Sequence, residues 1–212
     1  MEGYFIVGTD SGCGKTHVCA ALLRDFRARG VKAVGCMPVS CGDRRDARLL
    51  RDAMGDPAQP LDLVNPVHLR TVAAPLMAAE LEGRALSLDE LEQSCRAMAG
   101  QGGPLLVDSC GCWATPLAPG VIVGDLAVRL QLPVILVAAN RLGAAGQVAM
   151  AVNAMRLARV ACRGVILNST SDEWDTACVT NAGLIERCTG VPVLAQLIAG
   201  QDDVDSSALQ SN

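Results

Sequence analysis

A short glycine-containing segment near the start of the chain constrains the fold more than any other feature. The apolar run at residues 4–7 leads directly into residues 8–16, G-T-D-S-G-C-G-K-T, and a helical pattern follows. The negative charges of a polyphosphate must be held by backbone N–H groups, and a tight glycine loop at a helix N-terminus points these groups inward together. The order of strand, loop and helix is typical of a phosphate-binding P-loop, so we predict that the chain binds a nucleotide.

Two side chains of this loop fit particular roles. Lys15 is placed to reach the β- and γ-phosphates as a point charge, and the Thr16 hydroxyl is placed to ligate Mg²⁺. Lysine otherwise occurs only at Lys32, which makes Lys15 more informative. The usual pattern G-x-x-x-x-G-K-[ST] would have its first glycine at Thr9, but here the glycine stands one position earlier, at Gly8. This shift indicates a subgroup of P-loop proteins.

Composition favours one domain with a single large core. The chain has 212 residues, half of them apolar, and we expect a domain over residues 1–200 followed by a polar tail, residues 201–212, that frays. The net charge of −4 offers no basic field, so we expect no nucleic-acid partner. No signal peptide precedes the first strand and no apolar run approaches ~20 residues, so we expect a soluble, cytoplasmic protein with no membrane partner.

The ten cysteines do not have the spacing of a metal site. They are scattered without a C-x-x-C pair, and the closest spacing is Cys110-Gly111-Cys112, far in sequence from both histidines. We therefore interpret most of them as small buried residues in a reducing compartment.

Apolar runs alternate with amphipathic stretches along the chain. This pattern predicts an α/β fold of the P-loop NTPase type, a parallel sheet with helices on both faces. The expected strands cover residues 4–7, 33–36, 105–108, 134–138, 164–168 and 193–197. The expected helices cover residues 16–29, 45–54, 72–81, 88–99, 122–130, 143–160 and 176–188.

Ligands of such sheets bind at the carboxyl ends of the strands, so the residues that follow each strand are the first candidates for function. A loop of small residues, 37–42, follows the second expected strand. Asp108 ends the third, where P-loop enzymes place a carboxylate for the magnesium shell, although a turn or helix-cap role would also account for it. Asp46 begins a helix and is a second candidate ligand, unless it only complements the helix dipole.

Taken together, these segments resemble the dethiobiotin synthetase family over most of the chain. Residues 8–16 are similar to that family's G-T-D-T-x-x-G-K-T and residues 35–42 to its G-x-K-P-V-x-S-G. Further segments match in the same order and spacing: 74–79 with S-P-H-x-A-A, 108–113 with E-G-A-G-G-W, 132–137 with L-P-V-I-L-V, and 141–143 with K-L-G.

The resemblance implies an activity, its cofactors and an assembly. Enzymes of this family join CO₂ to 7,8-diaminopelargonic acid with ATP and Mg²⁺, closing a ureido ring in biotin biosynthesis. We therefore expect a ligase that uses ATP and Mg²⁺, with the diamine and CO₂ as substrates. The family also implies a homodimer with its substrate site at the subunit boundary, where residues 141–143 cross to the neighbouring subunit.

The resemblance assigns roles to individual residues as well. It implies catalytic positions at Lys15, Thr9, Ser11 and Ser40. It implies nucleotide contacts from the loop and from the strand-end asparagine that faces adenine: Gly12, Cys13, Gly14, Lys15, Thr16, His17 and Asn168. Substrate contacts would come from Met37, Cys41, Cys110, Leu142 and Gly143, and the metal ligands would be Thr16, Asp46 and Asp108.

Several positions depart from the family pattern on the carboxylation side. Met37 replaces the lysine that stabilises charge on the carbamate and the transferring phosphoryl group, an effect typically worth ~10²–10³ in rate. Cys41 replaces a serine, with Ser40 beside it as a candidate substitute. These changes leave open a second hypothesis, a nucleotide-binding paralogue or pseudoenzyme with lost or altered carboxylation.

Two related classes fit the sequence less well. A chromosome-partitioning ATPase would share the sheet, but it needs a lysine early in its loop, where this chain has Asp10. An amidotransferase of the cobyrinate diamide synthase type would need an additional glutaminase domain, for which the chain is too short.

Overall fold

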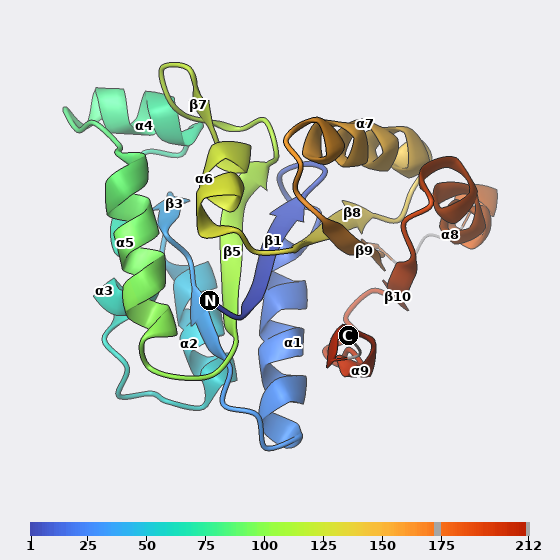
Figure 1. The fold of residues 1–212 in the computed structure, drawn as a ribbon, viewed down its shortest axis with the longest axis horizontal. Helices are drawn as coiled ribbons and strands as arrows, with labels where there is room; N and C mark the ends of the chain where they lie inside the picture. The colour runs from blue at the N-terminus through green and yellow to red at the C-terminus, as the bar shows by residue number, and fades with distance from the viewer. Residues whose placement is uncertain (172–174, 211–212) are drawn as a thin grey trace.

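A six-stranded parallel sheet forms the centre of the molecule (Figure 1). The computed structural model describes residues 1–171 and 175–210. The strands lie in the order β10-β9-β8-β1-β5-β2, and each neighbouring pair is parallel. Their bounds are Gly3–Gly8 for β1, Val34–Cys36 for β2, Leu105–Cys112 for β5, Val134–Ala139 for β8, Cys162–Asn168 for β9 and Val193–Leu197 for β10. The predicted α/β fold class is confirmed.

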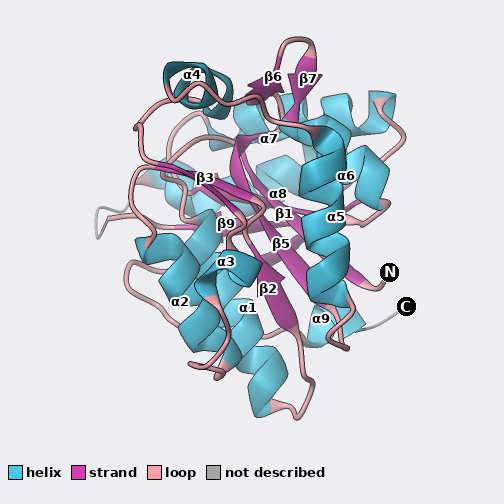
Figure 2. Ribbon diagram, turned by 90° about the vertical axis from the view of Figure 1, so that its left-hand side faces the viewer, coloured by secondary structure: helices cyan, strands magenta, loops and turns pink. Residues whose placement is uncertain are grey.

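Helices cover both faces of this sheet, because successive strand residues point to opposite sides. Phe5 and Val7 join one apolar cluster, whereas Ile6 joins a second cluster on the other face of the sheet. The first face packs against α5 (Leu88–Ala99), α6 (Val123–Leu130), α7 (Ala144–Leu157) and α8 (Thr176–Thr189). The second packs against α1 (Lys15–Ala28) and α2 (Arg45–Met54), and Figure 2 shows α5 and α2 on opposite sides of the strands. Within the described chain, no helix is long and apolar enough to cross a membrane.

Short elements around the sheet were not predicted. The expected loop at residues 37–42 contains β3 (Val39–Cys41), which pairs in parallel with β4 (Val67–Leu69). The other short elements are α3 (Leu61–Val64), α9 (Ser207–Gln210) and an antiparallel pair, β6 (Pro116–Ala118) with β7 (Val121–Ile122). The helix expected at 72–81 is shorter: α4 is Pro75–Leu81, with Pro75 in its first turn, where a missing N–H costs no helical bond.

The strand that carries Asp108 is longer than predicted. β5 continues to Cys112, so the prediction that Asp108 ends this strand is wrong. Asp108 lies beside Ile6 of β1, and the register shifts before Gly8 pairs with Cys112. Gly111 has a φ of 72°, a left-handed conformation that glycine adopts without strain. The irregular end of β5 was not recognised because its residues are small and polar.

The described part of the C-terminal segment, up to Gln210, is packed against the domain, where the sequence predicts a frayed tail; residues 211 and 212 of that predicted tail lie outside the described residues. Val204, Ser206 and Leu209 are buried, and the backbone N–H of Ser206 donates to a carboxylate oxygen of Asp25 in α1 at 2.9 Å. The Tyr4 hydroxyl donates to the carbonyl of Leu209. These contacts tie the described part of the tail to α1 and to the start of β1. The polar composition concealed them, because only a few apolar side chains anchor the segment.

Candidate nucleotide and substrate site

The loop between β1 and α1 has the backbone geometry of an anion site. Gly12 and Gly14 have φ values of 75° and 89°, and Gly14 caps α1. No acidic side chain lies in the first turn of this helix, so its N-terminal amides and positive dipole end remain suited to an anion. A Cβ atom on Gly14 would lie 2.1 Å from Nδ2 of Asn168, whose amide donates to the carbonyl of Cys13 at 3.1 Å. Asn168 thus braces the loop from the end of β9.

The early glycine of the loop has a steric reason. A Cβ atom on Gly8 would lie 2.7 Å from both the carbonyl oxygen of Asp10 and Sγ of Cys13, and 3.0 Å from Cδ of Lys15. The chain turns back over Gly8, which leaves no space for a side chain there. The backbone N–H of Thr9 then donates to the carbonyl of Val137 at 2.9 Å, which fixes the loop to β8.

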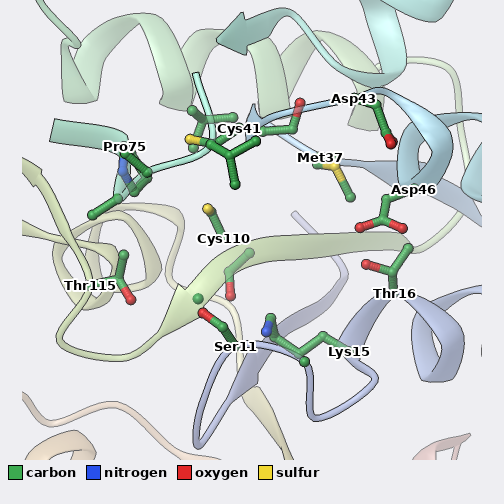
Figure 3. A pocket seen from close by; sticks show the side chains of 18 of the residues that line it. Ser11, Lys15, Thr16, Met37, Cys41, Asp43, Asp46, Pro75, Cys110 and Thr115 are labelled. Carbon is green, nitrogen blue, oxygen red and sulfur yellow. The ribbon is translucent and has the colours of Figure 1, made fainter. Parts of the chain in front are cut away.

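Lys15 holds its charge at the floor of the site. Its side chain is 8% exposed, and Nζ donates to the carbonyl of Asp10 at 3.1 Å. Among the residues that the structure describes, no carboxylate forms an ion pair with Lys15. The ammonium group therefore remains able to neutralise phosphate, and Figure 3 shows it beside Ser11.

Asp108 is a buried carboxylate that lacks a hydrogen-bond partner. Its side chain is 0% exposed, and neither oxygen accepts a hydrogen bond from any described residue. Burial raises the pKa of Asp108 to about 7, against the lowering effects of the nearby Thr16 hydroxyl and Lys15, and the charge of Asp46 adds to the rise. A buried acceptor without a donor requires an explanation, and a cation that binds there would supply one.

The three predicted metal ligands fit Mg²⁺. Figure 3 shows the Thr16 and Asp46 side chains facing one another, and the effect of Asp46 on the pKa of Asp108 places both carboxylates in one electrostatic environment. Hydroxyl and carboxylate oxygens are the ligands that Mg²⁺ prefers. The described chain has no cluster of three histidine, cysteine or acidic side chains that could enclose a metal ion by itself. Mg²⁺ would therefore share its coordination with phosphate oxygens and water, as is usual for this ion.

A cavity of about 730 Å³ opens in front of the loop. It brings together the majority of the predicted site residues: Ser11, Gly12, Gly14, Lys15, Thr16, His17, Met37, Ser40, Cys41, Asp46 and Cys110. Thr9, Cys13, Asp108 and Asn168 do not line it. The Thr9 hydroxyl is buried, and Cys13 directs its thiol to the carbonyl of Val137 at 3.4 Å.

Two further predicted residues lie at the start of α7. Leu142 is 77% exposed, and Gly143 caps α7 with a φ of 91°. Neither residue lines the cavity of this chain. Both residues are exposed at the surface, outside the cavity described above.

The wall opposite the loop is apolar and rich in sulfur. Met37 is 5% exposed and lies near Asp46 in Figure 3, where it contributes a thioether and no charge. The hydroxyl of Ser40 donates to Oδ1 of Asn65 at 2.8 Å, and the Asn65 amide donates to the carbonyl of Met37 at 2.9 Å. Ser40 therefore supports the backbone of this wall, and its hydrogen is already used.

The cysteine thiols of this wall influence one another. Cys41 is half-buried, and the Cys110 thiol lowers the pKa of Cys41. The Cys41 thiol together with burial raises the pKa of Cys110 well above its ordinary value. Both residues line the cavity, Cys41 from β3 and Cys110 from β5, which belong to different sheets.

Several lining residues were not among the predicted site residues. Asp43, Val72, Ser109 and Thr115 also line the cavity. The Thr115 hydroxyl accepts from the backbone N–H of Cys112 at 2.8 Å, and the buried Ser109 hydroxyl has no partner among described residues. Thr115 lies two residues after the segment 108–113 that matches the family pattern, and this proximity could have indicated it. No sequence signal distinguished Val72.

His17 links the site to the C-terminal segment. Its imidazole lines the cavity, yet Nε2 lies 2.6 Å from the carbonyl oxygen of Gln201 and Nδ1 lies 3.6 Å from a carboxylate oxygen of Asp202. The C-terminal segment therefore stands directly beside the first turn of α1.

This fold and this site define a P-loop nucleotide-binding protein of the α/β class. Residues 2–202 match a family model described as an AAA domain. The chain is 39% identical over 209 residues to an ATP-dependent dethiobiotin synthetase BioD of Akkermansia muciniphila, covering 99% of this chain and 98% of that protein. It is 38% identical over 201 residues to the protein of the same name from Anaeromyxobacter dehalogenans, covering 93% and 90%. The chain therefore belongs to the dethiobiotin synthetase family.

A comparison with solved structures supports the fold alone. The crystal structure of the cell division protein FtsY from Thermotoga maritima superimposes with a TM-score of 0.59 at 15% sequence identity. The match covers 98% of this chain and 66% of that one.

Proposed function

We propose that the protein is an ATP-dependent dethiobiotin synthetase, which carboxylates 7,8-diaminopelargonic acid and closes its ureido ring. The observation that carries this proposal is the arrangement of the loop, with Lys15 at its floor and the unpartnered Asp108 behind it, facing a cavity large enough for a second substrate. The identity to named synthetases over almost the whole chain supports the same activity.

The two sides of the cavity have separate tasks. Ser11, Gly12, Gly14 and the backbone at Cys13 bind the triphosphate, and Lys15 neutralises its β- and γ-phosphates. Thr16, Asp46 and Asp108 hold Mg²⁺, which supplies charge neutralisation of the phosphates when bound. Asn168 braces the loop, and its position at the end of β9 makes it a candidate contact for adenine. Cys41, Cys110 and Met37 form the wall against which the diamine binds.

Phosphoryl transfer explains why one cavity must hold both substrates. Ring closure removes one oxygen of the carboxylated amine, and transfer of the γ-phosphoryl group to that oxygen makes it a leaving group for the second amine. Lys15 stabilises the charge that develops on the transferring group. Met37 contributes no such stabilisation on the opposite side, so we expect slow turnover, with nucleotide binding intact.

We extend the proposal to a cytoplasmic homodimer that forms along α7. Leu142, just before α7, and Met150 and Leu157 within it are large apolar side chains that are 77%, 76% and 87% exposed. A second copy packed on this helix would cover them and bring Leu142 and Gly143 to the partner's substrate. Light scattering coupled to gel filtration tests this assembly: a dimer mass is expected, and Met150→Lys should shift it toward the monomer.

Substrate-dependent phosphate release tests the activity. The purified protein is incubated with ATP and Mg²⁺, with and without the diamine and bicarbonate, and phosphate is followed over time. We expect release that requires both substrates and that Lys15→Ala abolishes. Nucleotide binding without substrate-dependent release would instead support the paralogue or pseudoenzyme hypothesis.

A further inference from the structure

Two cysteines from separate strands meet inside the substrate cavity. Cys41 ends β3, and Cys110 lies in β5 beyond Asp108. Both are partly exposed, and both line the cavity. Figure 3 shows the Cys110 side chain pointing across the cavity toward Cys41. Each thiol also shifts the pKa of the other, so the two lie near one another, and both are partly accessible from solvent.

A second pair of cysteines shows that proximity alone does not make two thiols open to oxidation from solution. The sulfur atoms of Cys36 and Cys95 lie 4.0 Å apart, but both residues are 0% exposed. An oxidant in solution cannot reach them without unfolding. Cys112, two residues after Cys110, does not line the cavity, and its sulfur lies 3.5 Å from the Thr115 hydroxyl.

We propose that Cys41 and Cys110 form a redox-sensitive dithiol, which a small-molecule disulfide such as oxidised glutathione converts into an intramolecular disulfide. The Cys41 thiolate attacks one sulfur of the small disulfide, which forms a mixed disulfide and releases one thiolate. The Cys110 sulfur then attacks Sγ of Cys41, its proton passes to the released thiolate, and the second small thiol leaves. Two protein thiols are oxidised and one small disulfide is reduced to two thiols.

Cys41 is the better candidate for the first attack. It lies at the cavity surface, and the neighbouring Cys110 thiol favours its ionised form. Cys110 sits deeper in the sheet and acts second, when the mixed disulfide is already held beside it. This order predicts which cysteine carries the small thiol when the second step is blocked.

The cross-link would close the substrate side of the cavity and spare the nucleotide side. It would tie β3 to β5 where the apolar wall lies, while the loop at residues 8–16 stands on the other side. Formation of the cross-link does not depend on the proposed function. Only its expected effect on turnover rests on that function.

Peptide mass spectrometry without reductant tests the dithiol. Reduced protein is treated with oxidised glutathione, alkylated and digested. We expect one cross-linked pair of peptides containing Cys41 and Cys110, lighter by two hydrogen atoms and lost on reduction, with Cys36 and Cys95 still free thiols. In Cys110→Ser, glutathione should stay attached to Cys41. Cys188→Ser, which removes an exposed cysteine outside the cavity, should leave the cross-link unchanged.

Other outcomes would overturn the proposal. Absence of the cross-link in protein that remains folded would do so, as would preferential pairing of Cys36 with Cys95 or of Cys110 with Cys112. Binding of a fluorescent ATP analogue should survive oxidation, whereas diamine-dependent phosphate release should fall by about tenfold or more and recover on reduction. Protein that never releases phosphate but still forms the cross-link would contradict the proposed function and not the dithiol.

Discussion

Replacement of Asp108 by asparagine should stabilise the protein in the absence of ligands, and the gain should grow with pH. Burial raises the pKa of Asp108 from 3.8 to about 7, so at intermediate pH the folded protein keeps a proton that the unfolded chain releases. The free energy of unfolding therefore falls as pH rises from about 4 through about 7. The neutral amide removes this dependence.

The size of the effect follows from the pKa difference. About three pKa units at about 1.4 kcal/mol each give a penalty of about 4 kcal/mol above pH 7, once the folded carboxyl is ionised. At pH 5 the unfolded carboxyl is already ionised and the folded one is not, and the penalty is only about 2 kcal/mol. The stability gained by Asp108→Asn should therefore be about 2 kcal/mol larger at pH 8 than at pH 5.

Urea unfolding of both proteins at pH 5 and pH 8, without nucleotide or Mg²⁺, measures this difference. With Mg²⁺ and ATP bound, the wild-type protein should instead be more stable than Asp108→Asn, because asparagine at position 108 offers the ion no charged ligand. A gain for Asp108→Asn that is equal at both pH values would refute the reasoning.

Three further predictions concern the loop, the cavity wall and the C-terminal segment. Gly14→Ala would place a Cβ atom 2.1 Å from Nδ2 of Asn168 at a φ of 89°. We expect the free energy of unfolding to fall by ~1–3 kcal/mol, measured by thermal unfolding. An unchanged Tm would contradict the loop conformation. Met37→Lys returns a cation to the wall and should raise kcat by ~10²-fold in phosphate-release assays, whereas a slower variant would argue against a role of this wall in phosphoryl transfer. Asp25→Ala removes the acceptor of the Ser206 N–H. The free energy of unfolding should fall by about 1 kcal/mol, and limited proteolysis should cleave the C-terminal segment faster. Cleavage at the wild-type rate would contradict the packing of this segment against α1.

The sequence predicts the central sheet well because its strands are buried on both faces. The run at residues 134–138 is apolar throughout, as a strand covered by helices on two sides requires, and it lies within β8. Short elements carry too few residues for a periodic pattern. β3 and β4 have three residues each and depend on pairing with one another, which no local pattern reveals.

The candidate site also has a part that the sequence predicts and a part that it does not. The phosphate loop was recognisable because glycine spacing encodes its backbone, and the structure adds the steric reason for Gly8. The strand position of Asp108 could not be predicted, because the shift in register near Gly8 depends on contacts with β1. The sequence also did not reveal that Cys41 and Cys110 share a cavity, since 68 residues lie between them and they belong to different strands.

Incorporation of labelled bicarbonate tests the central claim most directly. The protein, with Mg²⁺, ATP and 7,8-diaminopelargonic acid, is supplied with ¹³C-bicarbonate, and the products are analysed by mass spectrometry. The account predicts dethiobiotin that carries the label in its ureido carbon, formed in step with ADP and absent when Lys15→Ala replaces the wild-type protein. Tight binding of ATP without labelled dethiobiotin, in protein that is folded and reduced, would contradict the account.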